Sequence, residues 1–399
     1  MSLTDFKPQF DNAYQEVFLK TNVAKAIMNT RFKSTLSYGE SVERVAFDIS
    51  NVQVRNVTRG AASTIDTISD TPELLEVNIE REAVFHISDG EVKQAGPLNP
   101  GETIGMKIAE KVSNDLDAKC FAEVLNAEYD FDAGDLTTGT STGVGITLSS
   151  TTVPQMVSRM AAKLRSKNNQ EVTRNMALVV DSYAGADITE YLLGKNIDLA
   201  GSVFKNGYTG DVSNAQMYIS ENLTGSSTVV LDIPTADEVI SINGVTFTAK
   251  AIPSTAGQFD IAASADAQGI ILVNAINGSA TGQDSATGYF EVSAADRATL
   301  TNAGIVASYD SGTDILTITG TGSGRITYST TLSGATTNVL HAYYGKKGAI
   351  DLVVQDIKEV DMRKTDDRRG TNVFTHYLAG LKTFSDGAKK FLDVIIAVA

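Results

Sequence analysis

The chain has no tryptophan, only three histidines and a single cysteine in 399 residues. With one cysteine, Cys120, no intrachain disulfide is possible, and its position within a helical pattern favours a buried structural thiol. The histidines, His86, His341 and His376, fall in separate segments without ligand-like spacing, so metal catalysis has no support and we predict no metal and no cofactor. Basic residues are also scarce, because 33 Lys and Arg stand against 48 Asp and Glu, for a net charge of −15. Specific binding to a nucleic-acid backbone needs a surplus of positive charge, so we do not expect it here.

Long apolar runs are absent as well. No segment approaches the roughly 18 apolar residues that a membrane-spanning helix needs. The first residues, 1–8, lack the basic flank and apolar core of a signal peptide. The sequence therefore predicts a soluble protein made in the cytoplasm, with no membrane partner.

What the chain does have is an abrupt change of composition between residues 224 and 340. This block is rich in Thr, Ser and Gly and carries only three basic residues against ten acidic ones. The sequence on both sides is ordinary mixed-charge material, so the block reads as a domain inserted into a host fold. Its strand-like runs, among them 289–292, and its turn dipeptides such as Asn243-Gly244 predict an ordered, mainly β or small α+β domain. Two short helical patterns, over 266–276 and 294–302, and six aromatic residues distinguish it from a flexible linker. Its two ends should lie close together, because both belong to one host unit.

The host sequence predicts an α+β fold with a distinctive order of elements. Residues 9–33 have helical spacing, and 41–88 alternate on both sides of a polar tip, which indicates a long β-hairpin. Thr103 is the predicted N-cap of a long helix over 104–126. Further elements are expected as a helix over 153–165, a strand over 176–181, a helix over 183–193, strands over 350–355, 372–378 and 392–398, and a charged loop over 361–369. A hairpin with only half-hydrophobic faces is hard to stabilise alone and usually lies on a partner.

Sequence motifs for enzymatic chemistry are weak. Gly139-Thr-Ser141-Thr-Gly143 matches a nucleophile elbow in letters, but the required strand before it and helix after it are not predicted. The acidic residues from Glu128 to Asp135 resemble a calcium loop, yet the glycine is misplaced and the twelfth position is Gly139, so a solvated acidic turn is the better interpretation. Lys346-Lys347 lacks the flanking pattern of a phosphate loop. We therefore predict that the protein is not an enzyme.

Several segments resemble the major capsid proteins of tailed bacteriophages, the Hong Kong 97 fold. Residues 203–223, 348–357 and 363–380 are similar to segments of coat proteins from short-tailed Salmonella-type phages, and the 224–340 block falls where those coats carry an extra domain. Ile240 to Phe247 also resembles domains of phage structural proteins. The resemblance covers about 280 residues.

The resemblance implies the fold, the domains and the partners. It implies an N-terminal arm (1–34), an extended hairpin or E-loop (35–100), a long spine helix, peripheral and axial core domains (101–223 and 341–399), and a β-rich insertion domain (224–340). It implies self-assembly through hexamers and pentamers into an icosahedral shell, a virion capsid formed in the host cytoplasm, that encloses double-stranded DNA without specific binding. Because no helical prodomain precedes the arm, a separate scaffolding protein is expected, together with a portal.

Charged residues of the hairpin and of the C-terminal part are candidate contacts between subunits, although a solvated surface explains any single one equally well. The candidates are Arg55, Arg59, Asp66, Asp70, Arg363, Lys364, Asp366, Asp367, Arg368 and Arg369. Two alternatives stay open. One is a surface or tail adhesion protein whose insert binds carbohydrate, against which the missing tryptophan counts. The other, more remote, is a serine hydrolase that uses Ser141.

Overall fold

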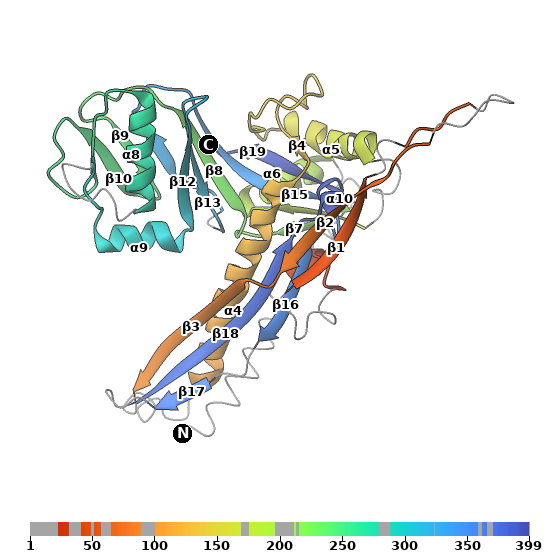
Figure 1. The fold of residues 1–399 in the computed structure, drawn as a ribbon, viewed down its shortest axis with the longest axis horizontal. Helices are drawn as coiled ribbons and strands as arrows, with labels where there is room; N and C mark the ends of the chain where they lie inside the picture. The colour runs from red at the N-terminus through yellow and green to blue at the C-terminus, as the bar shows by residue number, and fades with distance from the viewer. Residues whose placement is uncertain are drawn as a thin grey trace. The chain divides into compact units, whose positions relative to one another are not determined.

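A computed structural model describes residues 23–31, 41–48, 52–56, 65–88, 100–168, 175–195, 211–212, 215–278, 288–322, 324–357, 361–364 and 370–398. Its contacts divide the chain into two compact units. We call Met1–Val112 with Lys347–Lys390 the hairpin unit, and Ser113–Lys346 with Phe391–Ala399 the two-core unit. Both units contain helices together with mainly antiparallel strands, so the predicted α+β class is confirmed (Figure 1). Among the described residues, no helix is both long and apolar enough to cross a bilayer.

The strands of the hairpin unit are β1 (Ser41–Asp48), β2 (Ser69–Glu76), β3 (Ile79–Ser88), β16 (Asp351–Ile357), β17 (Asp361–Lys364) and β18 (Gly370–Lys382). β1 and β2 pair with each other as predicted, but β3 leaves them and pairs with β18 along ten residues. The prediction that one continuous strand forms the second side of the 41–88 hairpin is therefore wrong. The change of pairing partner occurs where the end of β2 passes Gly380 of β18. A Cβ atom at position 380 would lie 2.5 Å from the carbonyl oxygen of Glu76. Only glycine permits that close approach.

The long strand β18 organises the rest of this unit. It pairs with β3 on one side and with β16 and β17, one after the other, on its second side. Residues 361–364, expected as part of a charged loop, are thus a strand, because four residues of the charged stretch find ladder partners on β18. In this unit Leu75, Val353 and Phe384 are fully buried and form one hydrophobic cluster.

A long helix, α4 (Pro100–Ala122), continues into a 3₁₀ turn at Glu123–Asn126. The long helix is confirmed, but it begins at Pro100 and not after Thr103. Proline suits the first helical position, because its φ is preset and the missing N–H would have no partner there.

The two-core unit contains a nine-stranded sheet with the order β12-β13-β8-β15-β5-β7-β6, in which β19 pairs with β15 and β4 with β19. Their bounds are β4 (Tyr129–Phe131), β5 (Met176–Val180), β6 (Asp211–Val212), β7 (Ala215–Ile219), β8 (Thr224–Val230), β12 (Ile305–Asp310), β13 (Ile315–Gly320), β15 (Thr336–Lys346) and β19 (Phe391–Ala397). Two helices, α5 (Thr152–Asn168) and α6 (Ser182–Lys195), accompany this sheet, and both were predicted with slightly shorter bounds.

Two separate hydrophobic cores lie along this one sheet. The first, around Leu178, Val180, Tyr344 and Val394, contains no residue between 224 and 340. The second runs from Val229 to Leu332 and contains only residues from that block. Strand β15 connects them, since its beginning pairs with β8 and its end with β5.

The second core is completed by a smaller sheet, β11-β10-β9-β14, and by two helices. The bounds are β9 (Val239–Ile242), β10 (Val245–Lys250), β11 (Gln258–Asp260), β14 (Tyr328–Thr330), α8 (Ala265–Asn277) and α9 (Ala294–Asn302). The predicted turn at Asn243-Gly244 joins β9 to β10 with both residues at positive φ, which Asn and Gly tolerate best. A strand expected at 289–292 is only an isolated bridge between Phe259 and Tyr289.

Candidate functional site

The hairpin of β1 and β2 exposes an unusual number of large apolar side chains. Six of them form what we call the hairpin surface: Val45, Val52, Val54, Ile65, Ile68 and Leu74. Val54 and Ile65 are 104% and 89% exposed, as open as in an extended chain. Exposed apolar groups gathered on one element mark an interaction surface more often than isolated ones do. Figure 1 shows β1 and β2 side by side in this unit.

Beyond the paired strands, one ion pair connects the two sides of the hairpin. Both nitrogens of the Arg55 guanidinium lie 2.7 Å from the two carboxylate oxygens of Asp66, and the N–H of Gln53 donates to the same carboxylate. Its hydrogen bonds from Arg55 and Gln53 lower the pKa of Asp66. Two of the predicted intersubunit residues are therefore partners of each other within one chain.

Of the other candidate contacts, one lies on β2, two lie on β17, and the rest fall outside the described residues. Asp70 is exposed on β2. Arg363 pairs at 2.7 Å with Asp361 on its own strand and stacks over the ring of Phe374 at 5.5 Å. Lys364 is the last residue of β17. The remaining ones, Arg59, Asp366, Asp367, Arg368 and Arg369, lie outside the described residues.

A buried carboxylate joins the described N-terminal segment to the base of the hairpin. The helix α2 (Val23–Ile27) is followed by Asn29, whose main chain bonds to both neighbours of Asp351 on β16 and whose amide donates to the Asp351 carboxylate. Asp351 is only 3% exposed, and this burial raises its pKa to about 6.

Charged groups from the hairpin and from α10 (Ser385–Ala388) lie close to this carboxylate. Arg44 of β1 pairs with Asp386 at 2.6 Å, and Lys390 pairs with the same oxygen at 3.0 Å. Burial alone would raise the pKa of Asp386, but the hydrogen bonds from Arg44 and Lys390 outweigh it and hold the pKa below its usual value. We call Asn29, Arg44, Asp351, Asp386 and Lys390 the hairpin base.

The acidic turn after β4 is buried and ordered, contrary to the solvated turn expected from its sequence. Asp132 accepts hydrogen bonds from four main-chain N–H groups, those of Gly134, Asp135, Thr142 and Gly143. Its carboxylate thereby closes the loop on itself, which explains why it is fully buried.

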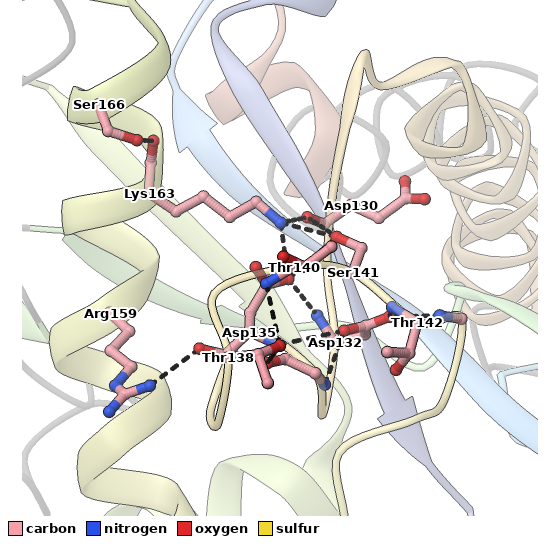
Figure 2. A network of polar contacts seen from close by, with 12 residues as sticks. Asp130, Asp132, Asp135, Thr138, Thr140, Ser141, Thr142, Arg159, Lys163 and Ser166 are labelled. Atoms are coloured by element: carbon pink, nitrogen blue, oxygen red, sulfur yellow. Dashed lines mark hydrogen bonds and ion pairs between the residues drawn. The ribbon is translucent and has the colours of Figure 1, made fainter.

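The ammonium of Lys163 on α5 ties this loop to the helix (Figure 2). It lies 2.6 Å from Asp135 Oδ2 and 2.7 Å from Ser141 Oγ, and it also donates to the carbonyl oxygen of Asp130. Three oxygen acceptors match the three donors of the ammonium, so Lys163 joins Asp130, Asp135 and Ser141 of the loop to α5. Ser141 itself lies in a loop between two glycines at positive φ, without the strand-turn-helix of a nucleophile elbow. This arrangement stabilises a loop.

The remaining candidates from the sequence are the cysteine and the three histidines, and each has neighbours within the fold. Cys120 is fully buried as predicted, and burial raises the pKa of its thiol well above the usual value. His86 contacts Asn372, His376 contacts Glu80, and His341 contacts Asp393. Within the described part of the chain, no three His, Cys, Asp or Glu residues are grouped so that they could hold a metal ion.

Sequence reasoning missed Lys163, the hairpin base, and the pair between Arg325 and Asp181. The guanidinium of Arg325 donates to the fully buried carboxylate of Asp181 and lies 5.0 Å from the ring centre of Tyr183. The only sequence signal for Arg325 is that it is one of three basic residues in a 117-residue block.

No family model and no curated protein matches the sequence. Similar solved structures include that of Mycobacterium phage Che8, with 12% identity, a TM-score of 0.49, and coverage of 94% of this chain and 90% of that chain. The capsid of cyanophage P-SCSP1u has 11% identity and a TM-score of 0.47, with 94% and 86% covered. A virus-like particle from Pyrococcus furiosus has 9% identity and a TM-score of 0.41, with 98% and 99% covered.

Proposed function

We propose that this chain is the major capsid protein of a tailed bacteriophage, a subunit that assembles with copies of itself into a closed shell. The observation that carries the proposal is the hairpin surface. Six apolar side chains stand open on the hairpin of β1 and β2 and on the segments that continue its strands. A hairpin of this kind needs a neighbouring surface for its stability.

The order of elements supports the same function. A described N-terminal segment, an extended hairpin, a long helix α4, a sheet-and-helix core and C-terminal strands follow one another as the resemblance to capsid proteins implies. Shell subunits need extended pieces that reach neighbours, because many weak contacts must add up over a closed lattice.

The finer features are part of this proposal. We infer that the subunits form hexamers and pentamers, that a separate scaffolding protein and a portal take part in assembly in the host cytoplasm, and that the finished virion shell holds double-stranded DNA without specific binding. The segment 361–369, with Arg363, Lys364, Asp366, Asp367, Arg368 and Arg369, is proposed as a subunit contact. So are Arg59 and Asp70 on the hairpin.

Residues 224–340 are proposed as an insertion domain on the outer surface of the shell. Its own core and the direct pairing of Thr224 with His341, at its two ends, support the insertion. The block has seven more acidic than basic residues. Enclosed DNA would repel that charge from the inner surface, whereas on the outside it keeps particles apart.

Electron microscopy of the expressed chain tests the proposal. The full chain, alone and co-expressed with neighbouring genes, is expected to give closed shells or rings of five and six subunits. The double variant Arg368→Glu, Arg369→Glu should lower the yield of particles while the circular dichroism of the subunit stays unchanged. A monodisperse monomer under all these conditions would contradict the proposed function.

A further inference from the structure

The two-core unit contains a cavity of about 750 Å³ at the edge of the second core. Its wall is formed by β14, by the segment that leads into β15, by Val398, and by Tyr183 at the start of α6. This volume is within the range of small-molecule binding sites, roughly 300–1,000 Å³. All of the lining residues belong to the same compact unit.

Uncharged hydrogen-bonding groups dominate the wall of this cavity. Hydroxyl and amide side chains from Thr327 to Asn338 line it, and Ser329 and Thr336 among them are exposed. Among the described residues of the lining, Arg325 is the only charged one. Its charge is offset by the buried carboxylate of Asp181, to which Nε and Nη2 donate. A polyanion or an isolated phosphate would therefore find little net positive charge here.

The main chain of β14 adds further donors and acceptors. β14 is the edge strand of its sheet and pairs only with β9. The carbonyl oxygen of Thr327 accepts from the N–H of Asn243, and the N–H of Thr331 donates to the carbonyl oxygen of Val239, so both groups point toward β9. Because main-chain groups alternate in an antiparallel pair, those of Tyr328 and Thr330 face the open side of β14. The edge thus presents N–H and C=O groups in fixed positions.

An aromatic wall completes the site. Tyr183 is 68% exposed, and the guanidinium of Arg325 lies over its ring, which holds the ring in place. Ile326 and Leu332 also line the cavity, but they are largely buried in the second core, so the Tyr183 ring is the main apolar surface open to a ligand. A ligand that matches this wall has many hydroxyl groups and also a flat apolar face, which is the surface pattern of a sugar ring.

We propose that this cavity binds a neutral saccharide, with the Tyr183 ring against the apolar face of a sugar and with the side chains of Arg325, Ser329 and Thr336 and the β14 main chain on its hydroxyl groups. The proposal stands independently of the capsid function. A metal ion does not fit, because none of the described residues that line the cavity has a carboxylate side chain. An extended peptide could use the β14 edge, but that edge is only three residues long.

Binding of the full chain to an array of neutral oligosaccharides of glucose, galactose and N-acetylhexosamines tests the proposal. We expect binding to at least one of these glycans, and Tyr183→Ala should weaken it by about tenfold, as expected for loss of a stacked ring. Ser329→Trp, which fills the cavity from an exposed position, should abolish it. Ile252→Ala, at an exposed position of the same block outside the cavity, is the matched control and should leave binding unchanged.

Three results would overturn the proposal. The first is the absence of binding to every glycan on the array. The second is glycan binding that survives in both the Tyr183→Ala and Ser329→Trp variants, with circular dichroism showing that the variants are folded. The third is binding to extended peptides, measured by fluorescence polarisation with a random peptide library, without binding to any glycan.

Discussion

The hairpin of β1 and β2 and the second core are built from the same kinds of residue and bury them to opposite extents. On the hairpin, Val54 and Ile65 are almost entirely exposed, whereas Phe247 and Phe259 of the second core are 1% and 0% exposed. The second core closes on itself through two sheets and two helices. The hairpin has strand pairing but little burial. Since burial of apolar surface is the main source of stability, the second core can be stable within one chain, and the hairpin needs a further surface.

The largest expected effect comes from breaking the closed core. Phe259→Ala removes a fully buried ring, and we expect it to lower the free energy of unfolding by about 3–5 kcal/mol. Chemical denaturation followed by circular dichroism measures this loss. Ile252→Ala, at a side chain 79% exposed in the same block, is the control and should change stability little. An equal effect of both variants would contradict a closed core.

A somewhat smaller effect is expected at the loop in the first core. Lys163→Met removes the ammonium and leaves the Asp135 carboxylate buried without its charged partner, at an expected cost of about 3 kcal/mol. Lys167→Met, on the exposed side of the same helix, is the matched control. Thermal unfolding of both variants distinguishes the buried ion pair between Lys163 and Asp135 from a surface charge. Equal melting temperatures for the two variants would argue against a stabilising ion pair.

The hairpin base is expected to make stability depend on pH. The pKa of Asp351 is about 6 in the fold and near 3.8 when unfolded, so between these values the folded state binds a proton that the unfolded state does not. Stability should therefore rise as the pH falls from 7 toward 4.5, by on the order of 1–3 kcal/mol.

Asp351→Asn tests this pH dependence, because the amide still accepts from Asn29 but does not titrate. Urea denaturation at pH 7 and pH 5 should show a flatter profile in this variant. Asp310→Asn, at an exposed carboxyl outside the hairpin base whose pKa is lowered, should leave the rise between pH 7 and pH 5 in place. An unchanged profile in Asp351→Asn would show that another group titrates.

The smallest effect on the subunit itself is expected at the hairpin surface. The double variant Val54→Ser, Ile65→Ser should change the free energy of unfolding by no more than about 0.5 kcal/mol, since both side chains are already exposed. Assembly, measured by sedimentation and electron microscopy, should instead fall severalfold. Ile252→Ser has comparable exposure outside the hairpin and should assemble normally. Full assembly of the hairpin variant would remove the basis of the proposed function.

The sequence predicted elements well where periodicity is local. The long helix, α5, α6, α8, α9 and the Asn243-Gly244 turn follow from spacing and turn chemistry, which short segments determine by themselves. The pairing of β3 with β18 could not be predicted, because alternation shows that a strand exists and not which strand it joins. The passage past Gly380 depends on a residue about 300 positions away.

The candidate sites were less predictable than the fold. Charge patterns identified Arg55 and Asp66 but could not show that they pair with each other. The burial of Asp132 and Asp135 was also missed, since the four acids from Glu128 to Asp135 look solvated until Lys163 and the loop N–H groups are placed around them. Such networks depend on tertiary contacts and leave no spacing in the sequence.

The pairing of Thr224 with His341 has a consequence for how this gene can change. Two neighbouring positions on adjacent strands can be joined by a tight turn, so a single recombination event between codons 224 and 341 could remove or exchange the whole block between them. The first core contains no described residue of that block. Removal of Arg325 would nevertheless leave the buried Asp181 carboxylate without its charged partner, so an exchanged block would need a cation at that place. If residues 224–340 are an insertion as proposed, they form a replaceable cassette that can diverge at a different rate from the part that carries it.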